Sequence, residues 1–160
     1  SPRTADSLAL MQTRLDKLGG KAGPVLFQLP ARFGVDLARL QEFLGLLAPG
    51  RPYVLEVRDE SWFDDAVYDL LRQHDVALCF SDHRDARTPW VITARHVYVR
   101  GHGPAGDYRD RYPEETLRDW AGHIRTWRHQ MRTVYVYFDN DQKGAAPHDA
   151  QRLRELVAES

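Results

Sequence analysis

The 160-residue sequence has one cysteine, Cys79, so an internal disulfide is excluded. Its neighbours Val76, Ala77, Leu78 and Phe80 are apolar, which predicts a small buried hydrophobe, because a reactive thiol needs a nearby base or cation. No apolar run approaches the roughly 20 residues of a membrane-spanning helix, and the first residues lack the apolar stretch of a signal peptide. These absences predict a cytoplasmic protein with no membrane segment.

An excess of charge of either sign is also absent. The chain carries 22 Lys and Arg against 23 Asp and Glu, with a net charge of −1 and a pI near 6.6. This balance argues against a dedicated nucleic-acid-binding protein, although arginine is frequent between residues 84 and 132 and a local basic patch stays open. Hydrophobic residues at 42% and charged residues at 28% are ordinary values. We therefore expect one globular domain over residues 1–160.

Several motifs that identify enzyme classes are missing. No glycine-rich phosphate loop follows the first predicted strand, Ser81 does not lie in a Gly-x-Ser-x-Gly elbow, and the chain has no His-Glu-x-x-His pair. We therefore expect no cofactor. A metal is the less favoured alternative, because each candidate ligand stands alone on its strand end. These ligands would be Glu56, Asp82, His102 and Asp139.

The sequence does contain a regular alternation of apolar runs and amphipathic stretches. Short apolar runs predict buried parallel strands, at residues 25–29, 53–57, 76–80, 96–100 and 134–138. Helical spacing of apolar residues predicts helices between them, at residues 5–18, from Asp36, after an N-cap at Ser61, from Pro113, and from about His148. Trp120 and Trp127 lie on one face of the fourth helix and are expected in the core. The class is α/β, and right-handed crossovers would connect the strands.

Polar residues gather where these strands end, which is where parallel α/β folds bind ligands. Glu56 interrupts an apolar strand, and Arg58 shares its face. This carboxylate could act as an acid or base, or the pair could be a buried ion pair that fixes packing. Both alternatives are open.

Arg100 and His102 form a second pair at strand spacing, followed by Gly103. A guanidinium beside an imidazole suits a phosphate or carboxylate group. We take Glu56 and His102 as candidate catalytic residues. The candidate substrate-binding residues are Gln28, Arg58, Trp62, Asp82, Arg100 and Asn140. Trp62, Tyr108 and Tyr112 follow strands and could stack on a planar ligand.

Five segments together resemble the YecE-like family, domain of unknown function 72. They are GPVLFQLP (23–30), EVR with SWF (56–58 and 61–63), VALC before SD (76–79 and 81–82), YVRGHG (98–103) and VYVYFDND (134–141). The resemblance implies a parallel (β/α) barrel of the TIM type, of which this chain matches the C-terminal two-thirds, strands four to eight. Gly101, Asp139 and residues 144–147 depart from the family pattern. The family name attaches no activity.

Three functions are compatible with these features. The first is an enzyme acting on a small anionic substrate at the carboxyl end of the barrel. The second is a nucleic-acid or nucleotide-binding module, or a metal-dependent phosphodiesterase, that uses Arg84, Arg87, Arg109 and Arg111. The third is a scaffold without chemistry. A partial barrel also exposes sheet edges, so we expect the chain alone to self-associate through residues 25–29 or 134–138.

Overall fold

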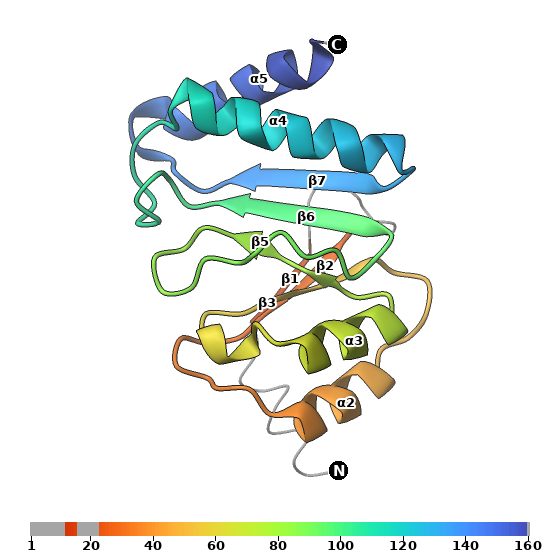
Figure 1. Ribbon diagram of the computed structural model, residues 1–160. Helices are drawn as coiled ribbons and strands as arrows, with labels where there is room; N and C mark the ends of the chain where they lie inside the picture. Colours follow the sequence, from red (N-terminus) through yellow and green to blue (C-terminus); the bar gives the residue numbers. More distant parts are fainter. Residues whose placement is uncertain (1–11, 16–22, 160) are drawn as a thin grey trace. The chain divides into compact units, whose positions relative to one another are not determined.

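The computed structural model describes residues 12–15 and 23–159 (Figure 1). The chain divides into two compact units. The first comprises Ser1–Cys79 with Thr88–Ala94, and the second comprises Phe80–Arg87 with Arg95–Ser160. Each unit has its own small sheet with parallel strands and helices, which confirms the predicted α/β class. No helix in the described part of the chain is both long and apolar enough to cross a membrane.

The first unit has a four-stranded sheet in the order β1-β2-β3-β4. Strands β2, β3 and β4 run parallel, and β1 pairs antiparallel with β2. Its helices are packed on an apolar core that includes Leu44, Leu55 and Leu71. The elements are β1 (Gln12–Leu15), β2 (Val25–Gln28), α2 (Leu37–Gly45), β3 (Tyr53–Glu56), η2 (Glu60–Trp62), α3 (Asp65–Gln73) and β4 (Ala77–Leu78).

The helix expected at residues 5–18 is wrong for residues 12–15, which form strand β1, and its remainder lies outside the described residues. Pairing with β2, with Leu15 opposite Val25, satisfies backbone groups that an edge strand would leave open. Strand β2 therefore has a neighbour on each side, β1 and β3. The expectation of self-association through residues 25–29 or 134–138 stays a prediction.

The helix expected to begin at Ser61 begins after Asp64 instead. The Asp64 side chain accepts a hydrogen bond from the Ala66 N–H and caps α3. The Ser61 hydroxyl lies in the short helix η2 and accepts from the Val35 N–H at 2.9 Å. Because that hydroxyl is already used, it cannot cap α3. The helix expected from Asp36 is α2, and the Asp36 side chain caps it.

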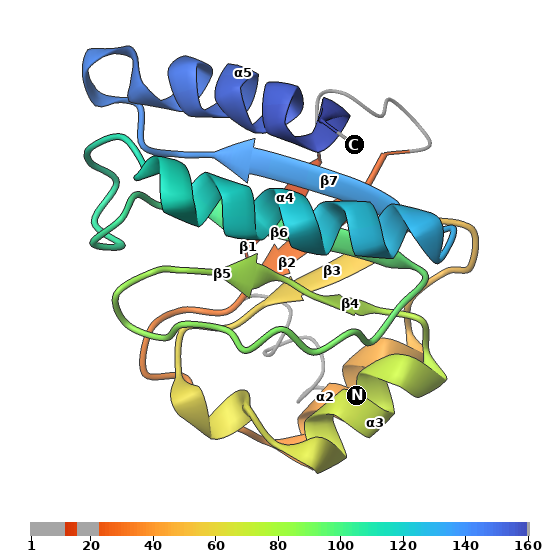
Figure 2. The same cartoon turned by 45° about the horizontal axis from the view of Figure 1, so that its top comes forward.

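The second unit has a three-stranded parallel sheet in the order β5-β6-β7. Helices α4 and α5 pack on each other and on β7, as Figures 1 and 2 show. The elements are β5 (Phe80–Ser81), β6 (His96–Gly101), α4 (Glu114–His129), β7 (Thr133–Phe138), η3 (Gln142–Gly144) and α5 (Ala145–Ala158).

The strand predicted at residues 76–80 is divided between the two sheets. The Cys79 N–H donates to the Leu55 carbonyl in the first unit, whereas Phe80 is opposite Val99 of β6 in the second. A continuous apolar run is compatible with either partner, so the pattern could not reveal the division.

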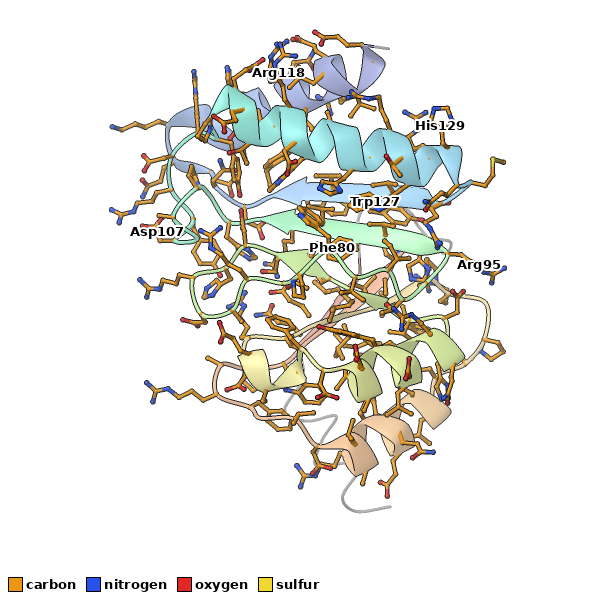
Figure 3. The ribbon with its side chains drawn as sticks, in the orientation of Figure 1. Phe80, Arg95, Asp107, Arg118, Trp127 and His129 are labelled. Atoms are coloured by element: carbon orange, nitrogen blue, oxygen red, sulfur yellow. The ribbon has the colours of Figure 1, made fainter. Side chains whose placement is uncertain are left out.

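Helix α4 confirms the predicted apolar face. Trp127 stacks on Phe80, with ring centroids 5.5 Å apart (Figure 3), and Trp120 stacks on Phe138 at 5.7 Å. Helix α5 begins at Ala145, after a left-handed Gly144, so His148 lies inside the helix and not at its start.

Candidate functional site

Five polar side chains lie at the carboxyl ends of the three strands in the second unit, and we call them the strand-end cluster. Because β5, β6 and β7 run parallel in one sheet, their carboxyl ends lie at the same edge, where α/β folds place their ligand sites. The members of the cluster are Ser81, Asp82, Arg100, His102 and Asp139.

His102 is the best-buried member of the cluster, with none of its surface exposed. Its backbone N–H donates to Asp82 Oδ1 at 2.7 Å. Its ring Nδ1 lies 3.3 Å from Ser81 Oγ and 3.5 Å from Asp82 Oδ1. The Ser81 hydroxyl can donate or accept, whereas the Asp82 carboxylate can only accept, and the carboxylate favours the tautomer with the proton on Nδ1.

The other ring nitrogen of His102, Nε2, is buried and has no hydrogen-bond partner among the described residues. Asp139 Oδ2 lies 3.9 Å away, too far for a direct hydrogen bond. With the proton on Nδ1, Nε2 carries a lone pair. The arrangement leaves a basic nitrogen that can accept a proton from a donor outside the described chain.

Arg100 and Asp139 form a charge-assisted pair beside this nitrogen. Arg100 Nε lies 2.5 Å from Asp139 Oδ2, and the arginine is only 4% exposed. The Asp139 N–H donates to the Gly101 carbonyl at 2.7 Å, which holds the aspartate at the end of β7. The positive charge of Arg100 is therefore fixed in position within the strand-end cluster.

Tyr112 supports the cluster from the loop that precedes α4. Its hydroxyl donates a short hydrogen bond to Asp82 Oδ2 and accepts from the Gly103 N–H at 2.8 Å. Burial raises the pKa of this phenol well above its ordinary value, and the negative charge of Asp82 raises it further. A loop position was expected to leave Tyr112 available for stacking on a ligand, but the ring is buried because its hydroxyl anchors Asp82.

This raised pKa predicts an alkaline loss of stability. Tyr112 binds its proton more tightly in the folded chain, so its stabilising contribution is complete below the ordinary tyrosine pKa of 10.0 and is lost as the pH rises above it. The free energy of unfolding should then fall by about 1.4 kcal/mol per pH unit from this residue. Denaturant unfolding from about pH 9 upward should show the free energy of unfolding falling with pH in the parent chain, with a slope that approaches one proton above about pH 11. This contribution should be absent in Tyr112→Phe. Equal pH dependence of the free energy of unfolding in the two proteins would contradict a raised pKa at Tyr112.

Asn140 and Asp149 form a second buried group, which Tyr112 links to the cluster. Asn140 Nδ2 donates to Asp149 Oδ2 and to the Asp110 carbonyl, both at 2.7 Å, and the Tyr112 N–H donates to Asp149 Oδ2 at 3.1 Å. Both side chains are fully buried. The group ties α5 and the end of β7 to the loop that carries Tyr112.

The sequence pattern predicts a helix from about His148 and does not single out Asp149. The signal was present, because Asp149 shares the apolar helix face of Leu153 and Leu156 at a spacing of four and seven residues. A carboxylate on such a face needs buried partners.

The loop of residues 103–112 approaches His102 closely. Gly103 has a φ of +96°, and a Cβ there would clash with the Arg109 carbonyl oxygen. The Tyr108 N–H donates to the His102 carbonyl at 2.5 Å, and the two rings meet edge to face with centroids 4.9 Å apart. Gly103 is therefore required for the turn that brings Tyr108 against the histidine.

In the first unit, Glu56 is fully buried at the end of β3. Its Oε2 accepts from Arg58 Nε at 3.1 Å and Nη2 at 3.0 Å, and its Oε1 accepts from Cys79 Sγ at 3.7 Å. Gln28 is opposite Glu56 in the pairing of β2 with β3. The predicted pairing of Glu56 with Arg58 is confirmed, and both carboxylate oxygens have partners.

Trp62 lies in the same unit and is only 2% exposed. Its indole N–H donates to the Phe33 carbonyl at 2.7 Å, and its ring stacks on Phe33 with centroids 6.3 Å apart.

The predicted site residues fall into two groups, one in each unit. The first contains Gln28, Glu56, Arg58 and Trp62, and the second contains Asp82, Arg100, His102 and Asn140. In the part of the chain that the structure describes, no three His, Cys, Asp or Glu residues are grouped as metal ligands.

Comparison with known proteins agrees with the resemblance noted above. UPF0759 protein YunF of Bacillus subtilis strain 168 is 27% identical over 131 residues, which cover 66% of this chain and 46% of that protein. A solved DUF72 family protein of Enterococcus faecalis is 18% identical with a TM-score of 0.72, over 84% of this chain and 58% of that chain. One from Thermotoga maritima is 24% identical with a TM-score of 0.71, over 82% and 56%.

The chain therefore spans about half the length of the relatives that it matches, and the solved structures support the fold alone. The sequence profile described as "Protein of unknown function DUF72" matches residues 2–160, nearly the entire chain. This chain belongs to the DUF72 family.

Proposed function

We propose that the strand-end cluster is the site of an enzyme that acts on a small substrate bearing a phosphate or carboxylate group. The observation that carries the proposal is the buried Nε2 of His102, which has no hydrogen-bond partner among the described residues. Buried polar atoms in proteins almost always have a partner. A substrate hydroxyl or a water held by the substrate would supply one.

His102 would act as the acid and base. Ser81 Oγ and Asp82 Oδ1 beside Nδ1 hold the ring in one tautomer and stabilise the imidazolium that forms when Nε2 accepts a proton. A second group that orients the first is the usual arrangement for a catalytic imidazole. Asp82 is in turn held by Tyr112.

Arg100 would provide the positive charge that attracts the substrate anion. A buried guanidinium interacts with an anion more strongly than an exposed one, because the surrounding dielectric constant is low. Its Nε bond to Asp139 keeps the guanidinium plane fixed.

Titration with inorganic phosphate tests this proposal. We expect the ring signals of His102, observed by NMR in histidine-labelled protein, to shift at phosphate concentrations up to about 10 mM, the range of weak ligands. The shift should be lost in Arg100→Gln and kept in Arg118→Gln, a matched change at an exposed arginine of α4. Absence of a shift, or its persistence in Arg100→Gln, would oppose an anion site here.

Turnover provides the second test. Phosphorylated and carboxylated metabolite mixtures incubated with the protein can be followed by phosphorus and proton NMR. For any compound that is converted, His102→Asn should lower the rate by about 10²–10⁴-fold. An unchanged rate would remove the acid-base role of His102.

The residues of the first unit enter the proposal as well. In the first unit, Glu56 would be a further acid or base, and Arg58, Gln28 and Trp62 would contact a substrate. In the second unit, Asn140 would be a further substrate contact. We also infer that the two sheets are parts of a TIM-type barrel, strands four to eight. Family membership and the parallel strands joined by helices support this inference. A single buried free cysteine supports a cytoplasmic location.

Nucleic-acid binding has weaker support. Of the arginines suggested for it, Arg109 bonds to Asp107 through Nε and Nη2, and Arg87 donates to the Pro104 carbonyl. With 22 Lys and Arg against 23 Asp and Glu, the chain also lacks the basic excess that drives binding to a phosphate backbone. Binding of duplex DNA that weakens steeply with salt would reverse this ranking.

A further inference from the structure

Two aromatic side chains pack against the ring of His102. The His83 ring meets it edge to face with centroids 5.2 Å apart, and the Tyr108 ring does so at 4.9 Å. The rings of His83 and Tyr108 also contact each other, with centroids 5.6 Å apart. All three residues belong to the second unit, so two further rings of the same unit contact the imidazole of His102.

The two loops that carry these rings, residues 82–87 and 103–112, are bonded to each other. The Arg84 N–H donates to the Gly106 carbonyl at 3.2 Å. A Cβ at Gly106, whose φ is +71°, would clash with the backbone nitrogen of Arg84. The close approach of the loops therefore requires glycine at this position, and it brings the two rings together.

Tyr108 has a φ of +69°, a left-handed backbone conformation that is costly for a bulky residue and easy for glycine. Its N–H donates to the His102 carbonyl at 2.5 Å, and a glycine would provide the same donor. The backbone alone thus favours glycine here. An outlier of this kind beside a candidate site points to a role for the side chain.

Hydrogen bonds alone restrain the orientation of the His102 ring only weakly. Its Nδ1 lies 3.3 Å from Ser81 Oγ and 3.5 Å from Asp82 Oδ1, and both distances exceed those of a typical hydrogen bond. Rotation of the ring would turn Nδ1 away from the Asp82 carboxylate and displace Nε2. The two ring contacts oppose this rotation, because an edge-to-face pair prefers one relative orientation.

We propose that His83 and Tyr108 are positioning residues that hold the imidazole of His102 in the orientation needed for proton transfer at Nε2. The inference rests on the proposed role of His102 as acid and base. A catalytic side chain depends on neighbours that are themselves fixed. His83 meets this condition, since its Nδ1 accepts from the Asp85 N–H and its own N–H donates to Ser81 Oγ, both at 3.2 Å.

Nitrogen NMR of histidine-labelled full chain tests the proposal, because it shows which nitrogen of the neutral His102 ring carries the proton. Tyr108→Gly removes the ring, suits the left-handed backbone and keeps the N–H donor. We expect the ratio of the Nδ1-protonated to the Nε2-protonated tautomer to fall about two- to ten-fold, the contribution of one edge-to-face contact. Tyr108→Phe keeps the ring and should keep the ratio.

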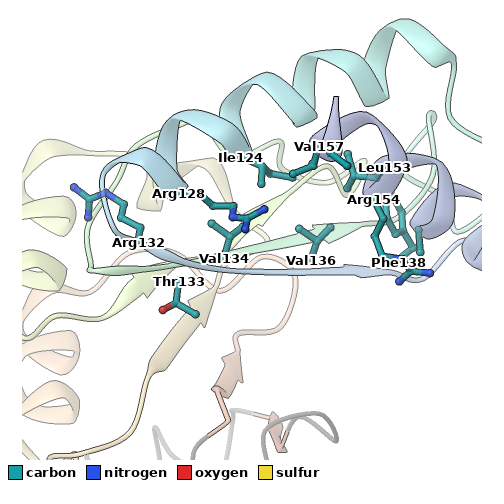
Figure 4. Close-up of a pocket in the computed structure, with 12 residues that line it drawn as sticks. Ile124, Arg128, Arg132, Thr133, Val134, Val136, Phe138, Leu153, Arg154 and Val157 are labelled. Carbon is teal, nitrogen blue, oxygen red and sulfur yellow. The ribbon is translucent and has the colours of Figure 1, made fainter. Parts of the chain in front are cut away.

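A second variant and a control accompany this pair. In His83→Asn the amide oxygen can replace Nδ1 as acceptor for the Asp85 N–H while the ring is lost, so the ratio should also fall. The control is Leu153→Ala. Leu153 is buried, and Figure 4 shows it with Ile124 and Val157 beside a pocket at β7. Its truncation loosens the second unit without removing a ring from His102, and the ratio should stay. Circular dichroism checks that each variant is folded.

Inorganic phosphate separates this inference from the proposed function. The anion would be held by Arg100, so Tyr108→Gly should bind phosphate within about two-fold of the parent chain. For any compound that is converted, the same variant should lower kcat by about ten-fold or more and leave KM nearly unchanged. A parent chain that does not bind phosphate would remove the anion site, whereas the tautomer ratio would still decide whether the rings position His102.

The positioning role is wrong if Tyr108→Gly and His83→Asn both keep the tautomer ratio of the parent chain. It is also wrong if Tyr108→Phe lowers the ratio as much as Tyr108→Gly, because the hydroxyl and not the ring would then be responsible. An equal effect of Leu153→Ala would show that general loosening of the unit is the cause.

Discussion

Replacing Glu56 by alanine is expected to lower the free energy of unfolding by about 3–5 kcal/mol. The carboxylate is fully buried, and Arg58 donates to it through Nε and Nη2. The Arg58 side chain is only 12% exposed. Removing the carboxylate would leave a largely buried guanidinium without its counter-charge, and water could replace that partner only in part.

Urea unfolding followed by tryptophan fluorescence measures this loss. Glu114→Ala is the matched control, because Glu114 pairs with Arg152 at the surface, where solvent screens the interaction, and its loss should be far smaller. Similar losses of unfolding free energy in the two variants would mean that burial does not strengthen the ion pair of Glu56 with Arg58.

The amide variant separates the two interpretations of Glu56. In Glu56→Gln the side chain keeps its shape and one oxygen acceptor for Arg58 but loses the counter-charge, so we expect a folded protein with a smaller loss of stability than Glu56→Ala. If Glu56 is an acid or base, turnover should be abolished in this folded variant. If the pair only fixes packing, turnover should survive.

Gly101→Ala is expected to destabilise the protein by about 1–3 kcal/mol, as overpacking of a core does. A Cβ at this position would lie 2.8 Å from Tyr112 Oη, 3.0 Å from Phe138 Cδ1 and 3.1 Å from Trp120 Cη2. None of these atoms is at the end of a flexible chain. The tyrosine hydroxyl is held by Asp82 and by the Gly103 N–H, so the added methyl group would disturb the support of the strand-end cluster.

Thermal or denaturant unfolding of two further variants tests whether the crowding around the added methyl group causes the loss of stability. Gly45→Ala, at a helical position with no atom within 4 Å of the added carbon, should be neutral or stabilising by about 0.5–1 kcal/mol. The double variant Gly101→Ala with Tyr112→Phe should be more stable than the sum of its single changes predicts, because the clash with the hydroxyl is gone. If the changes in the free energy of unfolding are strictly additive, overlap with the Tyr112 hydroxyl is not the cause of the destabilisation.

The same geometry explains a departure from the family pattern. A larger residue was expected between Arg100 and His102, but Gly101 lies where the rings of Tyr112, Trp120 and Phe138 converge. No local feature of the sequence indicates this, since Tyr112 follows 11 positions later in an irregular loop.

Local sequence determined most of the strands and the helix faces. Apolar runs identified β2, β3, β6 and β7, and helical spacing placed Trp120 and Trp127 in the core, because burial on one or both faces leaves a periodic pattern in the chain itself. The rule that parallel strands end at one edge was enough to bring Arg100 and His102 together with Asp82. These features depend on residues close in sequence or on strand direction.

Tertiary structure decided the remainder. Residues 12–15 became a strand because β2 offered an edge, and residues 76–80 were divided because two different strands accept their halves. Asp149 and Tyr112 joined the site from loops and a helix far along the chain. Such choices depend on which backbone groups and buried charges still need a partner after the local elements have formed, and a one-dimensional pattern does not record those partners.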